Sequence, residues 1–170
     1  ESKEKIQKEN DFYNQIILGE FSIENCKKPY IPETFEYVEG EWNNGFVVQD
    51  EKQNQYVWIP CININNNQNI EVLKNRNFSS NDFIKHFDCY ENNYEEFLYS
   101  ALTNGGFYIS RFEIGKDDNG NAVSQAGYEV FNNITKKEAI EISKNMQENI
   151  NSELINSYAY DTVLYWIINS

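Results

Sequence analysis

Three short runs of β-favouring residues constrain the fold of this chain more than any other feature. They occupy residues 35–38, 45–48 and 56–59 and read Phe-Glu-Tyr-Val, Gly-Phe-Val-Val and Tyr-Val-Trp-Ile. Residues 49–54, a polar turn, separate the second run from the third, which predicts a β-hairpin. Such short connections cannot hold the crossover that joins parallel strands, so the runs predict an antiparallel sheet. Pro60 is expected to end the third strand, because proline cannot donate to the ladder.

Helical and irregular segments flank these strands. Residues 2–20 combine balanced charge with few apolar positions, which is typical of a stalk or a peripheral helix. Residues 26–32 are interpreted as a linker. Residues 63–69, Asn-Ile-Asn-Asn-Asn-Gln-Asn, have low complexity and predict a surface loop. No stretch reaches the roughly 18 apolar residues of a membrane span.

The pattern then changes from helix to strand. Apolar periodicity from residue 81 to residue 101 predicts a helix, and Gly105 follows at the position where a left-handed residue ends such helices. A strand is predicted at residues 107–112. The Asn-Gly pair within residues 116–121 predicts a tight turn, because glycine adopts positive φ without strain.

Two further helices are predicted near the C-terminal end. Thr135 and Glu138 match the T-x-x-E pattern of a capping box, which starts a helix. Its apolar positions share one stripe: Ala139, Ile142, Met146 and Ile150. The last helix has a second apolar set, with Trp166 beside it: Tyr160, Val163, Leu164 and Ile167. The predicted fold is α+β, a small antiparallel sheet packed with two or three helices, plus an N-terminal helix.

The chain is strongly acidic. Of its 170 residues, 27 are acidic and 14 are basic, so the formal net charge is −13. Phosphate backbones bind clustered Lys and Arg, so nucleic acid is not expected as a partner. Insertion into or binding to an anionic membrane is not expected for this segment either. Cations, basic proteins and neutral glycans remain open, beside the simpler interpretation that the charge maintains solubility.

Few residues offer the chemistry of a catalytic or metal site. Cys26, Cys61 and Cys89 form no C-x-x-C pair, and with His86 as the one histidine a structural zinc site is not expected. Buried free thiols are the favoured state of the cysteines. His86 and Cys89 share a face of the predicted helix, but no oxyanion donor or orienting acid accompanies them. His86 is therefore interpreted as a histidine of the core or the helix surface.

One short loop offers oxygen ligands of the kind that calcium prefers: Asp117, Asp118, Asn119 and Asn121. The twelfth position of an EF-hand count, which should be glutamate, is Tyr128, and Glu129 comes one residue late. A plain turn is therefore the favoured interpretation. Asp50 and Glu51 are likewise interpreted as solvated charges at the tip of the hairpin.

Three blocks of sequence occur in a recognisable order. They are Tyr-Val-Trp-Ile-Pro at residues 56–60, Gly-Gly-Phe-Tyr-Ile-Ser-Arg-Phe-Glu-Ile-Gly at residues 105–115, and Asn-Asn-Ile-Thr at residues 132–135, followed by Glu138 and Ala139. Together they resemble the N-terminal half of formylglycine-generating enzymes, the sulfatase-modifying-factor family. The spacing is similar to that in Gram-positive proteins, some of which carry a pilin-like N-terminal helix.

This resemblance implies a division of the chain and a fold. Residues 1–28 would be an N-terminal helix and linker, and residues 29–170 a partial domain with an incomplete C-type lectin-like fold. Family members often carry a structural Arg/Glu pair that ties sheet to helix, at the positions of Arg111 and Glu113. The alternative for Arg111 is contact with a ligand.

The resemblance assigns no catalytic residue to this chain. In catalytic members the paired cysteines or the histidine-rich set, and a Gly-Asn-Val-Trp-Glu-Trp block, lie in a C-terminal half that would follow Ser170. Cys26, Cys61 and Cys89 fall in the other half, so no catalytic or metal residue is assigned, no binding residue is identified and no cofactor is expected.

Three hypotheses of function follow. The first is a non-catalytic binding or structural head domain, extracytoplasmic or at the cell surface, whose ligand is an unknown protein or glycan. The alternative is a truncated formylglycine-generating or nonheme-iron oxidase-type enzyme, and the coding sequence after Ser170 would distinguish the two. The third is self-association through a sheet edge that half a lectin-like core leaves uncovered.

Overall fold

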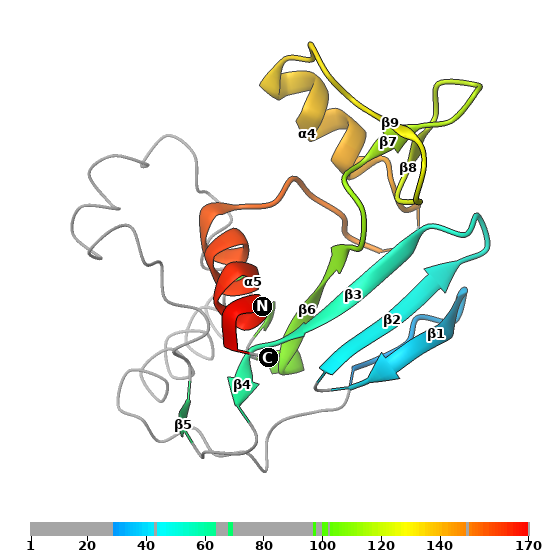
Figure 1. Cartoon of the computed structure of the whole chain (residues 1–170). Coiled ribbons are helices and arrows are strands. Elements are labelled where there is room, and N and C mark those ends of the chain that lie inside the picture. Colours follow the sequence, from blue (N-terminus) through cyan, green and yellow to red (C-terminus); the bar gives the residue numbers. More distant parts are fainter. Residues whose placement is uncertain are drawn as a thin grey trace, which may run out of the picture. The chain divides into compact units, whose positions relative to one another are not determined.

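The computed structural model describes residues 29–42, 44–63, 68–69, 97, 100–101, 103–148 and 150–169 (Figure 1). The predicted N-terminal helix, most of the helix predicted from residue 81, Cys26, Cys89 and His86 lie outside these residues. Within the described ranges, no helix is long and apolar enough to cross a membrane.

Within the described residues the strands form three antiparallel sheets. The largest sheet has the order β1-β2-β3-β6 and contains β1 (Phe35–Glu41), β2 (Asn44–Asp50), β3 (Gln55–Pro60) and β6 (Gly106–Ser110). A three-stranded sheet has the order β8-β7-β9, with β7 (Gly115–Lys116), β8 (Ala122–Val123) and β9 (Glu129–Val130). A third ladder pairs β4 (Ile62–Asn63) with β5 (Gln68–Asn69). With α4 (Lys136–Lys144) and α5 (Ser157–Asn169), these elements confirm the α+β class and the antiparallel sheet.

The chain divides into two compact units. One contains the described residues of Glu1–Tyr30, Ile59–Phe107 and Ser157–Ser170, and the other contains those of Ile31–Trp58 and Tyr108–Asn156. The first unit buries Ile59, Cys61, Ala101, Tyr158 and Ala159, and the second buries Val47, Val48, Trp58, Val123 and Met146. In the second unit the Trp58 and Tyr108 rings meet edge to face, with centroids 5.0 Å apart.

A β-bulge reshapes the edge strand β1. Tyr37 pairs with Val48, but Glu39 pairs with the next residue of β2, Val47, so that β1 holds one extra residue at Val38. Side chains alternate between the two faces of a strand. The extra residue therefore places Glu39 on the opposite face of the sheet from the one it would occupy without the bulge.

The predicted strands are confirmed, with one difference at a strand end, and one predicted loop is wrong. Residues 35–38, 45–48 and 56–59 lie within β1, β2 and β3, and Pro60 ends β3 as expected. The strand predicted at residues 107–112 ends at Ser110, where the chain bends. The prediction of a surface loop over residues 63–69 is wrong at both ends, because Asn63 pairs with Gln68 in a ladder that a low-complexity pattern does not reveal.

The helix after Thr135 begins as predicted and ends early. The Thr135 side chain accepts a hydrogen bond from the Glu138 N–H, and the Glu138 carboxylate accepts from the Thr135 N–H, which confirms the capping box. The helix ends at Lys144, and Asn145 caps it. Met146 and Ile150 therefore do not extend the predicted stripe; Met146 is buried beyond the helix, and Ile150 is exposed.

The buried face of α5 differs in part from the predicted one. Val163 and Leu164 are half-buried, but Tyr160 and Ile167 are exposed. The buried residues of the described part of α5 are Tyr158, Ala159, Asp161 and Thr162. The Thr162 hydroxyl donates to the Tyr158 carbonyl oxygen at 2.6 Å, which allows a polar residue to be buried within the helix. Apolar side chains occur on several sides of this helix, so its periodicity alone does not select the buried face.

Candidate functional site

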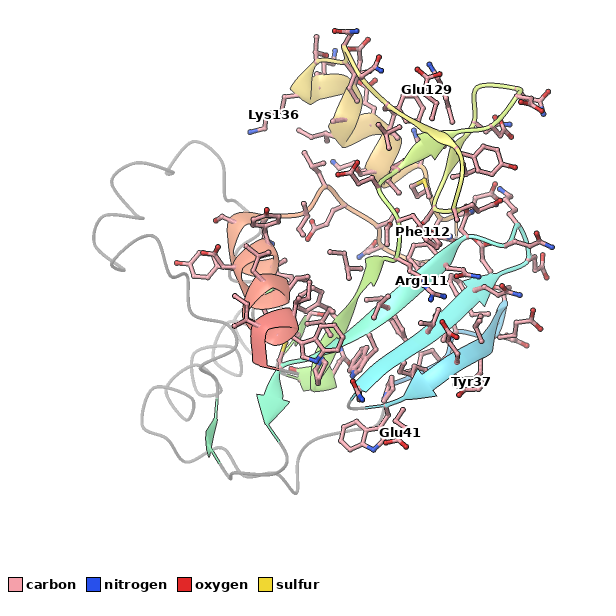
Figure 2. The ribbon with its side chains drawn as sticks, in the orientation of Figure 1. Tyr37, Glu41, Arg111, Phe112, Glu129 and Lys136 are labelled. Atoms are coloured by element: carbon pink, nitrogen blue, oxygen red, sulfur yellow. The ribbon has the colours of Figure 1, made fainter. Side chains whose placement is uncertain are left out.

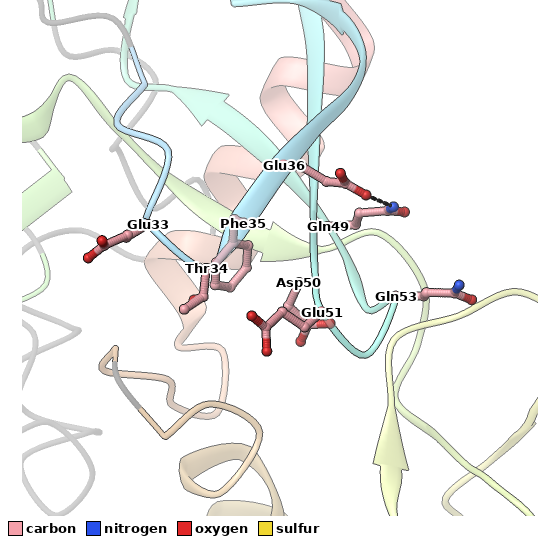
Figure 3. Close-up of a pocket in the computed structure, with 8 residues that line it drawn as sticks. All are labelled: Glu33, Thr34, Phe35, Glu36, Gln49, Asp50, Glu51 and Gln53. Carbon is pink, nitrogen blue, oxygen red and sulfur yellow. Dashed lines mark hydrogen bonds between the residues drawn. The ribbon is translucent and has the colours of Figure 1, made fainter.

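A depression of about 470 Å³ lies in the second unit, where β1 begins and β2 ends (Figure 3). Its lining combines four carboxylates with uncharged side chains: Glu33, Thr34, Phe35, Glu36, Gln49, Asp50, Glu51 and Gln53. None of these lining residues is basic. A concave surface with charges of one sign attracts groups of the opposite charge and hydrogen-bond donors.

Asp50 is the most enclosed of the four carboxylates. The residue is 8% exposed, whereas the three glutamates of the lining are exposed. Asp50 Oδ1 accepts hydrogen bonds from the backbone N–H groups of Lys52 and Asn54, each at 2.9 Å, and Oδ2 accepts from Asn54 Nδ2 at 2.9 Å. The interpretation of Asp50 as a solvated tip charge is therefore wrong, because the turn folds its own donors around the carboxylate. Glu51 is exposed, as expected.

A side chain distant in sequence completes the environment of Asp50. Gln147 Nε2 donates to Asp50 Oδ2 at 2.6 Å and to the Tyr56 hydroxyl at 2.7 Å. Burial raises the pKa of Tyr56 to about 12; the hydrogen bond from Gln147 opposes this rise and the negative charge of Asp50 adds to it. No pattern in the sequence indicates that Gln147 belongs to this site, because the contact depends on how the chain folds after α4.

Asn54 links the turn by a hydrogen bond to Ser124, the residue that follows β8. It is 2% exposed, and its Oδ1 accepts a hydrogen bond from the Ser124 N–H at 2.8 Å. The Ser124 hydroxyl donates to the Gln55 carbonyl oxygen, also at 2.8 Å. Buried polar groups that are all paired hold a single arrangement, so the turn forms an ordered floor beside the depression.

A row of polar side chains crosses the four-stranded sheet next to this floor. Gln49 Nε2 donates to Glu36 Oε1 at 2.5 Å, and Gln55 Nε2 reaches Gln49 Oε1 at 3.5 Å. At the other end, Arg111 Nη1 donates to Gln55 Oε1 at 2.8 Å. The register places Glu36 opposite Gln49 and Gln49 opposite Gln55, so these side chains share one face of the sheet. We call this row of side chains, Glu36, Gln49, Gln55 and Arg111, the polar ladder.

Arg111 ends the polar ladder and has a different partner from the predicted one. Its Nη2 lies 2.5 Å from Glu39 Oε1, and its guanidinium lies over the Phe112 ring at 5.5 Å (Figure 2). The bulge at Val38 brings Glu39 to the face of Arg111, so the arginine ties the end of β6 to β1 and β3. The prediction that Arg111 pairs with Glu113 to tie sheet to helix is therefore wrong in its partner.

The Asp117 loop repeats the geometry of the Asp50 turn. Asp117 Oδ1 accepts from the N–H groups of Asn119 and Asn121, and Oδ2 accepts from Asn121 Nδ2 at 3.0 Å. The hydrogen bonds from Asn121 and Asn119 hold the pKa of Asp117 below its usual range. These bonds confirm the interpretation as a turn, since the carboxylate oxygens point into the turn's own donors. Among the described residues, no group of three or more His, Cys, Asp or Glu side chains could hold a metal ion.

Of the three cysteines, the structure describes Cys61. It is fully buried, and its Sγ lies 3.9 Å from the Ile59 carbonyl oxygen. The expectation that this cysteine is buried is therefore confirmed. It lies in the unit that does not contain the depression.

No protein-family model matches this chain, and no curated protein or solved structure gives a significant match. The resemblance to formylglycine-generating enzymes thus depends on the three sequence blocks alone.

Proposed function

We propose that this chain is a non-catalytic binding domain, built on an incomplete C-type lectin-like scaffold of the formylglycine-generating type and displayed at the cell surface. The observation that carries the proposal is the depression beside the polar ladder. Glu51 lies in a turn whose buried ends, Asp50 and Asn54, are hydrogen-bonded to each other and to Gln147 and Ser124. Glu36 lies in β1 and accepts a hydrogen bond from Gln49, so both acceptors are held in place before a ligand arrives.

The chemistry of the depression defines the class of ligand. Carboxylates and amide oxygens accept hydrogen bonds, and the net charge of −13 attracts cationic groups. The fitting partners are a protein that presents Lys or Arg side chains, or a neutral glycan that presents hydroxyl groups. Both belong to the partner class expected from composition.

An array of surface proteins and neutral glycans tests the proposal. We expect binding that weakens when Glu36 and Glu51 are changed to Gln, because both carboxylates line the depression. Glu153→Gln is the matched control, since Glu153 is exposed and lies outside the lining. Absence of binding across the array at high micromolar concentration would contradict the proposal, and so would an equal loss in the control.

The other hypotheses gain less from the structure. The described residues provide no observation that favours a truncated oxidase over a binding domain. For self-association, β1 is an edge strand of its sheet, but it carries Glu36, Glu39 and Glu41 and a bulged register. Charge and bulges are features that reduce pairing between sheet edges. Association through this edge stays a prediction, which light scattering tests.

A further inference from the structure

The sequence contains three Asn-Gly dipeptides, at Asn44, Asn104 and Asn119. In this dipeptide the backbone nitrogen of glycine can attack the Cγ of the asparagine carboxamide, because glycine has no side chain to hinder the approach. A C–N bond forms, ammonia leaves, and water opens the resulting succinimide to aspartate or isoaspartate. The reaction needs no enzyme and no oxidant, but it requires a carboxamide that is free to rotate toward the next nitrogen.

All three asparagines are exposed, so access to solvent does not distinguish them. All three following glycines have positive φ, at +70°, +79° and +82° for Gly45, Gly105 and Gly120, so backbone handedness does not distinguish them either. What differs is the hydrogen bonding of each dipeptide.

Two of the three dipeptides are held by hydrogen bonds. Asn104 Nδ2 donates to the Ser100 carbonyl oxygen at 2.8 Å and reaches its hydroxyl at 3.3 Å. The carboxamide must break these contacts to react. In the second case the Gly120 N–H, which carries the attacking nitrogen, donates to the Asp117 carbonyl oxygen at 2.9 Å. The Asn119 backbone N–H also donates to the Asp117 carboxylate at 2.9 Å.

The Asn44 carboxamide lacks such restraint. Within the described part of the chain it makes no hydrogen bond, and no neighbouring atom lies within 4 Å of a Cβ placed on Gly45. The backbone of Asn44 and Gly45 pairs with Glu41, so the difference from Asn104 lies in the side chain. We propose that Asn44 is a site of spontaneous deamidation, and that it converts ahead of Asn104 and Asn119 in the folded protein.

The position of Asn44 gives the modification a structural effect. Asn44 is the first residue of β2, opposite Glu41 at the end of β1. Gly40 and Gly45 approach so closely there that a Cβ on Gly40 would overlap the Gly45 carbonyl oxygen. Isoaspartate adds one methylene to the backbone, which this close approach cannot absorb without a shift in register. We therefore expect the modified chain to lose protection of the β1–β2 pairing near the turn.

Peptide mapping by mass spectrometry tests the proposal. The folded protein is held at mildly alkaline pH and sampled over days, and a deamidated peptide gains one mass unit. We expect the Asn44 peptide to convert several-fold faster than the Asn104 and Asn119 peptides. In urea, where the restraints are absent, the three rates should converge. Equal rates in the folded protein, or a faster rate at Asn104 or Asn119, would overturn the proposal.

Two variants test the cause. Asp117→Ala removes the carboxylate that holds Asn119, so conversion at Asn119 should accelerate several-fold while Asn44 is unchanged. Asn44→Gln should abolish conversion at that position, because glutamine would have to form a less favourable six-membered ring. No acceleration in Asp117→Ala, with its far-ultraviolet circular dichroism unchanged, would show that hydrogen bonding does not set the order.

Discussion

At the scale of single residues, Asp50 and Asp117 occupy equivalent positions in two hairpin turns. Each begins an Asp-x-x-x-Asn sequence, accepts hydrogen bonds from the N–H groups two and four residues later, and bonds to the amide of the final asparagine. The fourth position has positive φ in both, at Gln53 (+66°) and Gly120 (+82°). The terminal residues of the Asp50 turn, Asp50 and Asn54, are buried, whereas those of the Asp117 turn are not, and Asp50 gains a further donor from Gln147.

This pair provides a direct comparison of a buried and a surface carboxylate. We expect Asp50→Ala to lower the free energy of unfolding by about 3 kcal/mol, because it leaves several buried donors without an acceptor. Asp117→Ala removes the same bonds at the surface, where water replaces them, and should have a much smaller effect. Urea denaturation measures both. Equal losses would show that burial of the turn has no energetic consequence.

Tyr56 should make stability depend on alkaline pH. Its pKa is raised from 10 to about 12, with burial as the main cause. Between these two values the unfolded chain loses the phenol proton while the folded chain keeps it, so unfolding becomes more favourable as pH rises. The contribution is complete below pH 10 and is lost as pH rises through about 12. Denaturant melts across this range, compared between the wild type and Tyr56→Phe, measure it; identical slopes would contradict the assignment.

At the scale of elements, the sequence of α4 predicts the residue at which the helix begins better than the residue at which it ends. The capping box at Thr135 starts α4 at the predicted residue, but the helix ends at Lys144, before the predicted apolar stripe is complete. The β1–β2 hairpin similarly depends on Gly40, whose φ of +86° and close approach to Gly45 no other residue type would accommodate.

Removal of the cap should destabilise α4. Thr135→Ala eliminates the acceptor for the Glu138 N–H, and we expect a loss of about 1 kcal/mol. Thr135→Ser retains the hydroxyl and should restore most of the stability. Circular dichroism during denaturation provides the measurement, and an equal loss in both variants would contradict a capping role.

The two glycines of the hairpin should respond differently to substitution. Gly45→Ala meets no neighbouring atom and should lose about 1 kcal/mol from its positive φ alone. Gly40→Ala has the same strain and also places its Cβ against the Gly45 carbonyl oxygen, so we expect a loss at least twice as large. Thermal melts of the two variants test this order. A larger loss in Gly45→Ala than in Gly40→Ala would contradict the close contact between Gly40 and the Gly45 carbonyl oxygen.

At the scale of the whole molecule, the acidic composition dominates behaviour in solution. The net charge of −13 keeps molecules apart at neutral pH and vanishes near the pI of about 4.5. We expect light scattering to show little association at neutral pH in low salt. Association should increase as pH approaches 4.5 or as salt screens the repulsion. A particle size that does not change across these conditions would contradict the role of charge.

Much of the fold could be predicted from the sequence, and much less of the candidate site. The strands β1, β2, β3 and β6, the positive φ of Gly105 and the capping box follow from runs of β-favouring residues, glycine and hydrogen bonds between near neighbours, so they are visible in short windows. The short strands β4, β5, β7, β8 and β9 are not. The polar ladder and the contact between Gln147 and Asp50 join residues from distant segments, and no short window contains both partners. The family resemblance implies a pair of Arg111 with Glu113, whereas the bulge in β1 brings Glu39 to Arg111 from a distant segment.

The two Asp-x-x-x-Asn turns show where sequence stops and tertiary structure begins. The sequence alone predicted a hairpin turn at residues 49–54 and a tight turn at residues 116–121. Each turn can form locally because its donors and acceptors lie within five residues of one another. The sequence did not determine that Asp50 would be buried beside Gln147 and Tyr56, or that Asp117 would stay at the surface. A turn is buried only when residues from distant segments pack around it. Gln147 packs against Asp50 in this way, so Asp50, and not Asp117, lies beside the depression.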